Sequence, residues 1–209
     1  ACLVGSEMCI RDRVNLLYGE NPNKAVRAFT KPFHEAGIQT HMLDRGLNGL
    51  RMYPVPADVR RLMYKVKHAQ GVDITRIFCG LNEVRNIIPS IRYALEAGMI
   101  PQATLCITFS PVHTVEYYTA IAERLIEAGA PEICLKDMAG VGRPEMLGRL
   151  TKAIKERHPE IIIQYHGHSG PGLSMASILE VCENGADIID VAMEPISWGK
   201  VHPDVISCL

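Results

Sequence analysis

Short apolar runs alternate along the chain with longer segments in which apolar residues recur every three or four positions. The short runs are typical of strands, and the longer segments are typical of amphipathic helices. Strands are therefore expected at 38–45, 74–81, 103–109, 132–138, 161–168 and 188–194. Helices are expected at 22–36, 57–70, 83–97, 114–128, 144–157 and 173–184.

Glycine marks the ends of the predicted helices. These glycines are Gly37, Gly71, Gly98, Gly129 and Gly185, at intervals of 34, 27, 31 and 56 residues. A glycine just past a helix supplies the left-handed residue that satisfies the last carbonyl groups. Most intervals have the length of one strand–helix unit and the last is close to two. The pattern therefore predicts an α/β fold of the TIM (β/α)8 barrel type.

The length of the chain predicts that this barrel is incomplete. Eight units typically need about 250 residues, whereas the chain has 209 and its pattern gives about six units. We expect a partial barrel over residues 14–209, with the strands at 38–45 and 188–194 left as unpaired edges. A fragment of this kind is expected to aggregate and to be inactive when expressed alone.

Residues 1–13 stand apart from the repeating pattern. They show neither helical nor strand periodicity, and Arg11 and Arg13 follow the apolar residues, which is the reverse of a signal peptide. The segment closely resembles a translated sequencing-adaptor artefact. We interpret it as a non-native, adaptor-derived segment and exclude it from the fold prediction.

The composition excludes several classes of function. The chain is 47% hydrophobic with a formal net charge of −1, which argues against a nucleic-acid-binding surface. Its apolar runs fall short of the roughly 18 residues of a membrane span, so no direct membrane insertion is expected. The seven cysteines show no C-x-x-C spacing. This favours a reducing compartment, the cytoplasm, over a disulfide framework.

Two motifs whose key residues lie 30 positions apart carry the candidate chemistry. EICLKDMAG contains Lys136, and IIQYHGHSG contains His166 and His168. Because 30 residues is about one strand–helix unit, Lys136 and His166 are expected at equivalent positions on neighbouring parallel strands. In a β/α barrel the carboxyl ends of the strands carry the active site.

His166 and His168 are candidate metal ligands. Alternate residues of a strand share a face, so both imidazoles point the same way, about 6.6 Å apart along the strand. They can converge on one cation where the strand ends, and a polar neighbour, Gln164, and nearby glycines favour a metal site there. The alternative is that both histidines are hydrogen-bonded polar residues at the mouth of the barrel.

Lys136 is expected to face the barrel interior together with Glu132 and Cys134. A buried lysine is unfavourable unless it is paired or neutral. One interpretation is an ion pair with Glu132, Asp137 or a carboxylate across the barrel. The other is that burial lowers the lysine pKa, so that the neutral amine reacts with carbon dioxide and the resulting carbamate binds a divalent metal.

Four segments of the chain are distinctive in combination: Arg45-Gly-Leu-Asn-Gly49, Ser110-Pro-Val-His-Thr114, Lys136-Asp-Met-Ala-Gly140 and His166-Gly-His168. Together they resemble the biotin-dependent carboxyltransferase family, which includes the carboxyltransferase part of pyruvate carboxylase and the α subunit of oxaloacetate decarboxylase. The resemblance extends over essentially all of residues 14–209.

This resemblance implies a function and a set of site residues. The chain would exchange a carboxyl group between carboxybiotin and a 2-keto acid, pyruvate or oxaloacetate, through an enolate. Carboxylated Lys136 would bind a divalent metal, zinc or manganese, with His166 and His168, and Arg45 would contact the keto-acid carboxylate. Lys136 and Arg45 are thus the catalytic candidates. The implied partners are a biotin carrier protein or domain and further subunits, in a homo-oligomer or a multi-subunit complex.

The chain departs from the family in ways that keep alternatives open. The family's fourth ligand is an aspartate on the first barrel strand, which the segment from Val14 onward lacks, and the loop after His168 differs from the usual one. An aldol-type metallolyase or an acyl-CoA condensing enzyme would share the barrel and the H-x-H motif. Those enzymes have an Asp-Thr-x-Gly element where this chain has Lys136 to Gly140. A non-catalytic interaction fragment is the third possibility.

Overall fold

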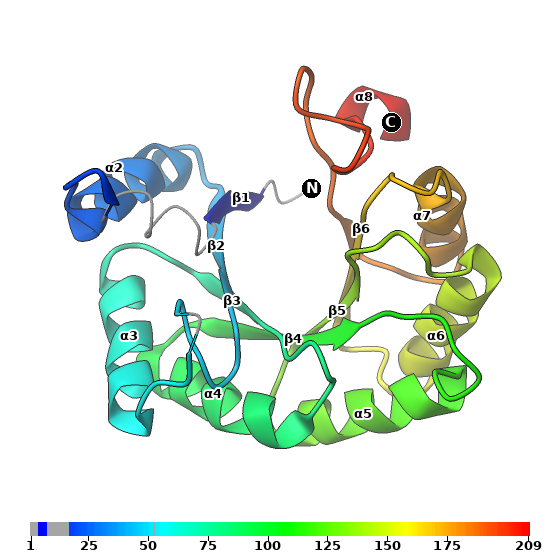
Figure 1. Ribbon diagram of the computed structural model, residues 1–209, viewed down its shortest axis with the longest axis horizontal. Helices are drawn as coiled ribbons and strands as arrows, with labels where there is room; N and C mark the ends of the chain where they lie inside the picture. Colours follow the sequence, from blue (N-terminus) through cyan, green and yellow to red (C-terminus); the bar gives the residue numbers. More distant parts are fainter. Residues whose placement is uncertain (1–3, 8–16, 52) are drawn as a thin grey trace. The chain divides into compact units, whose positions relative to one another are not determined.

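A computed structural model of the chain describes residues 4–7, 17–51 and 53–209 (Figure 1). The chain divides into two compact units. The first comprises Ala1–Cys79, Glu83–Ala103 and Ala128–Ala130, and the second comprises Gly80–Asn82, Thr104–Glu127 and Pro131–Leu209. Each unit is built from parallel strands that alternate with helices.

The first unit contains three strands and the beginning of a fourth. Its strands are β1 (Val4–Glu7), β2 (Gln39–Asp44), β3 (Ile74–Ile77) and the start of β4 (Ile100–Cys106). Its helices are α2 (Pro22–Glu35), α3 (Ala57–Ala69) and α4 (Val84–Ala97). The strands pair in parallel in chain order, with His41 opposite Ile74 and Ile74 opposite Ile100. This order is what short β/α connections produce.

Apolar faces of the helices and strands form the core of the first unit. The buried cluster comprises Val26, Met42, Tyr64, Val72, Ala94 and Met99. Asp44 at the end of β2 is buried, and its Oδ2 accepts hydrogen bonds from Tyr64 at 2.8 Å and Thr75 at 2.9 Å. Burial nevertheless raises the pKa of Asp44 from 3.8 to about 6, although these hydrogen bonds and Arg60 oppose the shift.

The second unit holds the remaining elements. Its strands are the end of β4, β5 (Glu132–Asp137), β6 (Ile162–Gly167) and β7 (Ile188–Ile189), and its helices are α5 (Val115–Glu127), α6 (Pro144–Arg157), α7 (Ser174–Glu183) and α8 (Val205–Cys208). Strands β5 and β6 pair in parallel over six residues, from Glu132 opposite Ile162 to Asp137 opposite Gly167. At the end of β4, the amide of Ile107 donates to the carbonyl of Lys136 at 2.8 Å.

Helices α5, α6 and α7 cover the outer side of the strands of the second unit (Figure 1). The apolar stripe of α5 is buried at Val115, Tyr118, Ile121, Ala122 and Leu125. Ile133 and Leu135 of β5 are fully buried. Within the described residues, no helix is both long and apolar enough to cross a membrane.

The predicted fold class is confirmed: within the described residues parallel strands alternate with helices in chain order, from β1 and α2 to β7 and α8, which makes an incomplete TIM barrel. The six predicted helices and six predicted strands are all present. Three strands differ from their predicted bounds by three residues or more: β3 ends at Ile77, β4 is Ile100–Cys106, and β7 contains only Ile188 and Ile189.

One expectation about the edges is wrong. Val4–Glu7, inside the segment that we excluded, form β1 and pair in parallel with β2, with Val4 opposite Gln39. The edge of β2 is therefore not open, because β1 pairs with its backbone. A strand of four residues is too short to show a periodicity of its own. The adaptor-derived origin of residues 1–13 stays a prediction, and residues 1–3 and 8–13 lie outside the described ranges.

Candidate metal centre

The H-x-H motif occupies the carboxyl end of β6. His166 and His168 bring their Nε2 atoms to 3.3 Å from each other. Gly167 lies between them, and a Cβ at this position would collide with the hydroxyl of Tyr165. The glycine therefore lets the strand end pass over a buried tyrosine while the two imidazoles stay together.

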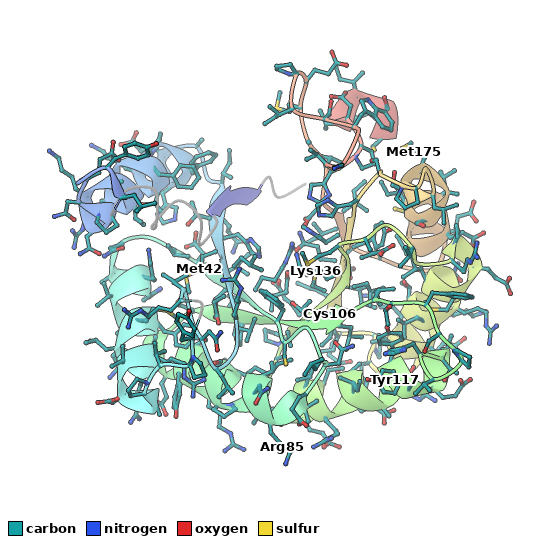
Figure 2. The ribbon with its side chains drawn as sticks, in the orientation of Figure 1. Met42, Arg85, Cys106, Tyr117, Lys136 and Met175 are labelled. Carbon is teal, nitrogen blue, oxygen red and sulfur yellow. The ribbon has the colours of Figure 1, made fainter. Side chains whose placement is uncertain are left out.

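Lys136 joins the histidines from the neighbouring strand. It lies directly opposite His166 in the β5–β6 register, as the 30-residue spacing predicts. Its side chain is on the side of β5 away from α5 and α6 (Figure 2). The Nζ atom lies 3.0 Å from Nε2 of His166, and the residue is only 4% exposed. The structure thus brings together the three residues that we predicted as metal ligands.

Asp137, one of the predicted ion-pair partners of Lys136, binds the loop that follows β5. Its carboxylate accepts hydrogen bonds from the amides of Val141 at 3.0 Å and Gly142 at 2.8 Å. Burial raises the pKa of Asp137, and these backbone hydrogen bonds oppose the rise. The carboxylate therefore shapes the loop at the end of the strand that carries Lys136.

Each imidazole of the motif is oriented through Nδ1. His166 donates from Nδ1 to the carboxylate of Asp190 at 2.5 Å, and the same carboxylate accepts a hydrogen bond from Gln164. His168 donates from Nδ1 to the carbonyl of Lys200 at 2.6 Å. Metal-binding histidines usually donate their second ring N–H to a carboxylate or a carbonyl in this way.

A third imidazole, that of His202, stands beside the motif. Its ring centroid lies 4.4 Å from that of His166 and 4.8 Å from that of His168. Its Nδ1 lies 2.8 Å from the carbonyl oxygen of Gly167. One potential ligand atom from each of the three histidines lies within 4.8 Å of the other two. Burial lowers the pKa of His202 below its ordinary 6.5, although the Gly167 carbonyl and Asp190 oppose the shift.

Sequence reasoning missed His202 and Asp190. Asp190 directly follows β7, so the rule that polar residues after neighbouring strands meet at one edge of the sheet would have found it. His202 lies 34 residues after His168 in an irregular segment, and no periodic pattern connects the two. The fold alone brings His202 to the site.

The electrostatics of the cluster favour a cation. A carbonyl oxygen only accepts hydrogen bonds, so Nδ1 of His168 and of His202 carries a proton, and in the neutral form of each ring Nε2 has a lone pair. The Nδ1 of His166 faces a carboxylate in the same manner. Two lone pairs that face each other at 3.3 Å repel unless positive charge lies between them. This set of nitrogen donors fits a divalent metal such as zinc.

The remaining candidates lie elsewhere in the fold. Arg45 belongs to the first unit, directly after β2, where its amide donates to the carbonyl of Gly49 at 2.9 Å. Its predicted contact with a keto acid stays a prediction. His113, which we left unassigned, binds Ser110 at 2.7 Å and packs edge-on against Tyr117 at the start of α5.

Residues 79–196 match the family described as HMGL-like, and the chain belongs to this family. Among curated proteins, it is 36% identical over 197 residues to a pyruvate carboxylase subunit of Methanocaldococcus jannaschii, covering 94% of this chain and 33% of the relative. It is 34% identical to the methylmalonyl-CoA carboxyltransferase 5S subunit of Propionibacterium freudenreichii, covering 94% of this chain and 38% of that subunit. The resemblance to biotin-dependent carboxyltransferases is thereby confirmed.

Solved structures agree with this assignment. The carboxyl transferase domain of Rhizobium etli pyruvate carboxylase with pyruvate matches with a TM-score of 0.90 and 28% identity, over 97% of this chain and 36% of that one. The same domain with pyruvate and biocytin matches with a TM-score of 0.89 and 29% identity, over 99% of this chain and 35% of that one. The chain thus spans about a third of the length of the relatives that it matches.

Proposed function

We propose that the protein containing this chain transfers a carboxyl group between carboxybiotin and a 2-keto acid, pyruvate or oxaloacetate. The observation that carries the proposal is the 3.0 Å contact between Lys136 and His166 at the carboxyl ends of β5 and β6. The relatives named as pyruvate carboxylase and carboxyltransferase support the same reaction class.

The residues proposed to hold a divalent metal, zinc or manganese, are His166, His168 and carboxylated Lys136. The Nε2 atoms of the two histidines and the carbamate oxygens on the buried side chain of Lys136 would be the donors that such a site needs. When bound, the metal would act as a Lewis acid toward the keto oxygen of the substrate and stabilise the charge of the enolate. Asp190 keeps the His166 lone pair directed at the site by accepting the Nδ1 proton.

Carboxylation of Lys136 follows from its surroundings. A neutral amine attacks carbon dioxide, an N–C bond forms, and one proton leaves the nitrogen. Nε2 of His166, 3.0 Å away, is within reach to accept that proton. An unmodified, protonated Lys136 would place a positive charge in this buried site, whereas the carbamate carries a negative charge. The carbamate therefore attracts the metal cation, and the bound cation stabilises the carbamate.

Arg45 is proposed to orient the substrate through a two-pronged hydrogen bond to its carboxylate. A biotin carrier protein or domain would deliver carboxybiotin, and the whole protein would work as a homo-oligomer or a multi-subunit complex in the cytoplasm. Because the chain spans about a third of its relatives, these partners belong to the complete protein.

The two alternative functions would not require a modified Lys136. An aldol-type metallolyase or an acyl-CoA condensing enzyme would use the H-x-H motif without a modified lysine. A non-catalytic interaction fragment would need neither the lysine nor the metal. The contact between Lys136 and His166 therefore favours carboxyl transfer over both.

The test is Lys136→Arg in the full-length protein. Arginine keeps the positive charge but forms no carbamate, so we expect biotin-dependent oxaloacetate decarboxylation to be lost while the melting temperature stays close to that of the wild type. The matched control is Lys152→Arg, because the side chain of Lys152 on α6 is 62% exposed. Wild-type activity in Lys136→Arg would overturn the proposal.

A further inference from the structure

We propose that His202 is a third imidazole ligand of the same metal ion, bound through Nε2. The inference rests on the proposed metal centre and extends it to the turn between Trp198 and Asp204. Neither the H-x-H motif nor the lysine motif indicates this turn. Three features of the structure support it: the backbone hydrogen bonds that hold the turn, the orientation of the His202 ring, and the short distances between the three imidazoles.

Backbone hydrogen bonds hold this turn beside the H-x-H motif. The amide of Ser169 donates to the carbonyl of Val201 at 2.8 Å, which fixes the turn to the loop after β6. The amide of Trp198 donates to the carbonyl of His202 at 2.8 Å, and the amide of Ala192 donates to the carbonyl of Pro203 at 2.9 Å. The backbone of His202 is therefore held in place at the site.

The imidazole of His202 is oriented by the motif itself. Its Nδ1–H donates to the carbonyl of Gly167, the residue between His166 and His168. With Nδ1 bound to Gly167, Nε2 is the ring nitrogen that remains to bind a cation. The ring lies edge-on to that of His166, with the planes at 75°, so the two rings do not stack face to face.

The three histidines gather ring nitrogens in one place, each within 4.8 Å of the other two. All three Nδ1 atoms bind oxygen acceptors, namely Asp190, Lys200 and Gly167. A purely structural role for His202 would be fulfilled by the single hydrogen bond to Gly167, and it would give no reason to bring a third imidazole this close to the other two. A shared cation explains the arrangement, because one nitrogen of each ring can bind it.

The distances suit a common ion after a small adjustment of one ring. Ligand nitrogens that bind a tetrahedral metal at 2.0–2.1 Å lie about 3.4 Å apart. The Nε2 atoms of His166 and His168 already lie at 3.3 Å. The ligand atom of His202 is within 4.8 Å of the other two, so its ring has to approach by at most about 1.4 Å. Such a shift requires side-chain rotation, and the backbone of the turn can stay fixed.

The same turn also orients one of the other ligands. The carbonyl of Lys200, two residues before His202, accepts the Nδ1–H of His168 at 2.6 Å. The segment after β7 thus supplies a proposed ligand, His202, and the group that fixes His168. Metal binding should therefore order this turn, and the turn should in return strengthen metal binding.

The test counts the bound imidazoles in the cobalt-substituted full-length protein by proton NMR. Each histidine bound to Co²⁺ through Nε2 gives one strongly shifted, exchangeable Nδ1–H signal, so we expect three such signals in the wild type. The variant is His202→Asn, because the asparagine amide can still donate to Gly167 but offers no nitrogen at the Nε2 position. We expect two signals from this variant and metal affinity about tenfold weaker or more.

His158→Ala is the control, because His158 follows α6 and pairs with Glu160 outside the cluster. It should keep all three signals and the wild-type affinity. Two signals in the wild type, or equal signals and affinity in the wild type and His202→Asn, would overturn the role of His202 and leave the H-x-H site standing. Cobalt binding that survives His166→Ala and His168→Ala would instead overturn the proposed metal centre itself.

Discussion

Nζ of Lys136 lies 3.0 Å from Nε2 of His166, across two parallel strands that pair directly at these residues. The other nitrogen of His166 is bound to Asp190, so the lone pair of Nε2 faces the lysine and the neighbouring His168. A buried amine, two imidazole lone pairs and an orienting carboxylate are thereby gathered at one strand end. Every prediction about the metal centre follows from this arrangement.

Metal content should depend on both histidines of the motif. Each supplies a lone pair that a buried cation needs, so His166→Ala and His168→Ala should each lose most of the metal bound by the full-length protein. Metal analysis of the purified proteins measures this directly. His34→Ala is a suitable control, since His34 pairs with Asp73 in the first unit. Full metal content in both motif variants would show that the ion binds elsewhere.

Asp190 should act as a positioning residue. In Asp190→Asn the amide group must face either Nδ1–H of His166 or the amide of Gln164, which are both donors. We expect metal affinity to fall about 10- to 100-fold, as measured by competition with a chelator.

A second substitution should restore part of that loss. In the double variant Asp190→Asn, Gln164→Glu, the new carboxylate accepts from the asparagine amide, and the asparagine oxygen can again accept from His166. Recovery of metal affinity in the double variant would show that the loss in Asp190→Asn comes from a donor facing a donor. Unaltered affinity in Asp190→Asn alone would refute the orienting role.

Arg45 should govern recognition of the keto acid. A lost charge-assisted hydrogen bond costs about 1.5–3 kcal/mol, so Arg45→Ala should raise the KM for pyruvate or oxaloacetate roughly 10- to 100-fold. Metal content should not change, because the proposed ligands come from β5, the end of β6 and the turn that holds His202. Arg27→Ala, on the exposed side of α2, is the control. If Arg45→Ala and Arg27→Ala have equal kinetics, the carboxylate is held by another group.

Much of this site is predictable from the sequence because it follows from strand geometry. His166 and His168 share a face through the two-residue period of a strand, and Lys136 meets them through the length of one strand–helix unit. The same regularity predicts the helices and most strands to within a few residues.

Other parts of the structure leave no periodic signal. His202 reaches the cluster through backbone hydrogen bonds of an irregular turn, and such hydrogen bonds do not depend on side-chain pattern. β1 and β7, with four and two residues, are too short to display a period. β1 was therefore missed, and β7 was predicted several residues too long.

Stability should depend on pH through Asp44 in the first unit. Its pKa in the folded state is raised from 3.8 to about 6, so the folded protein binds the proton more tightly than the unfolded chain does. The stabilisation of the folded state that comes from binding this proton is fully present below about pH 4 and is lost as the pH rises through 6. The shift of about two units corresponds to roughly 3 kcal/mol.

Asp44→Asn removes this titration while its oxygen can still accept from Tyr64 and Thr75. We expect the variant to lose the decline in unfolding free energy between pH 4 and pH 6 that the wild type shows. Chemical denaturation at several pH values measures the difference. Parallel pH profiles of the wild type and Asp44→Asn would contradict the assignment of this decline to Asp44.

The most direct test of the central claim is carbon-13 NMR of the full-length protein equilibrated with carbon-13 dioxide. Carboxylation of Lys136 predicts one carbamate carbonyl signal that persists near neutral pH in the metal-bound protein. The signal should be absent from Lys136→Arg and retained in Lys152→Arg. A wild-type spectrum without a carbamate signal, or a signal that survives Lys136→Arg, would contradict the account.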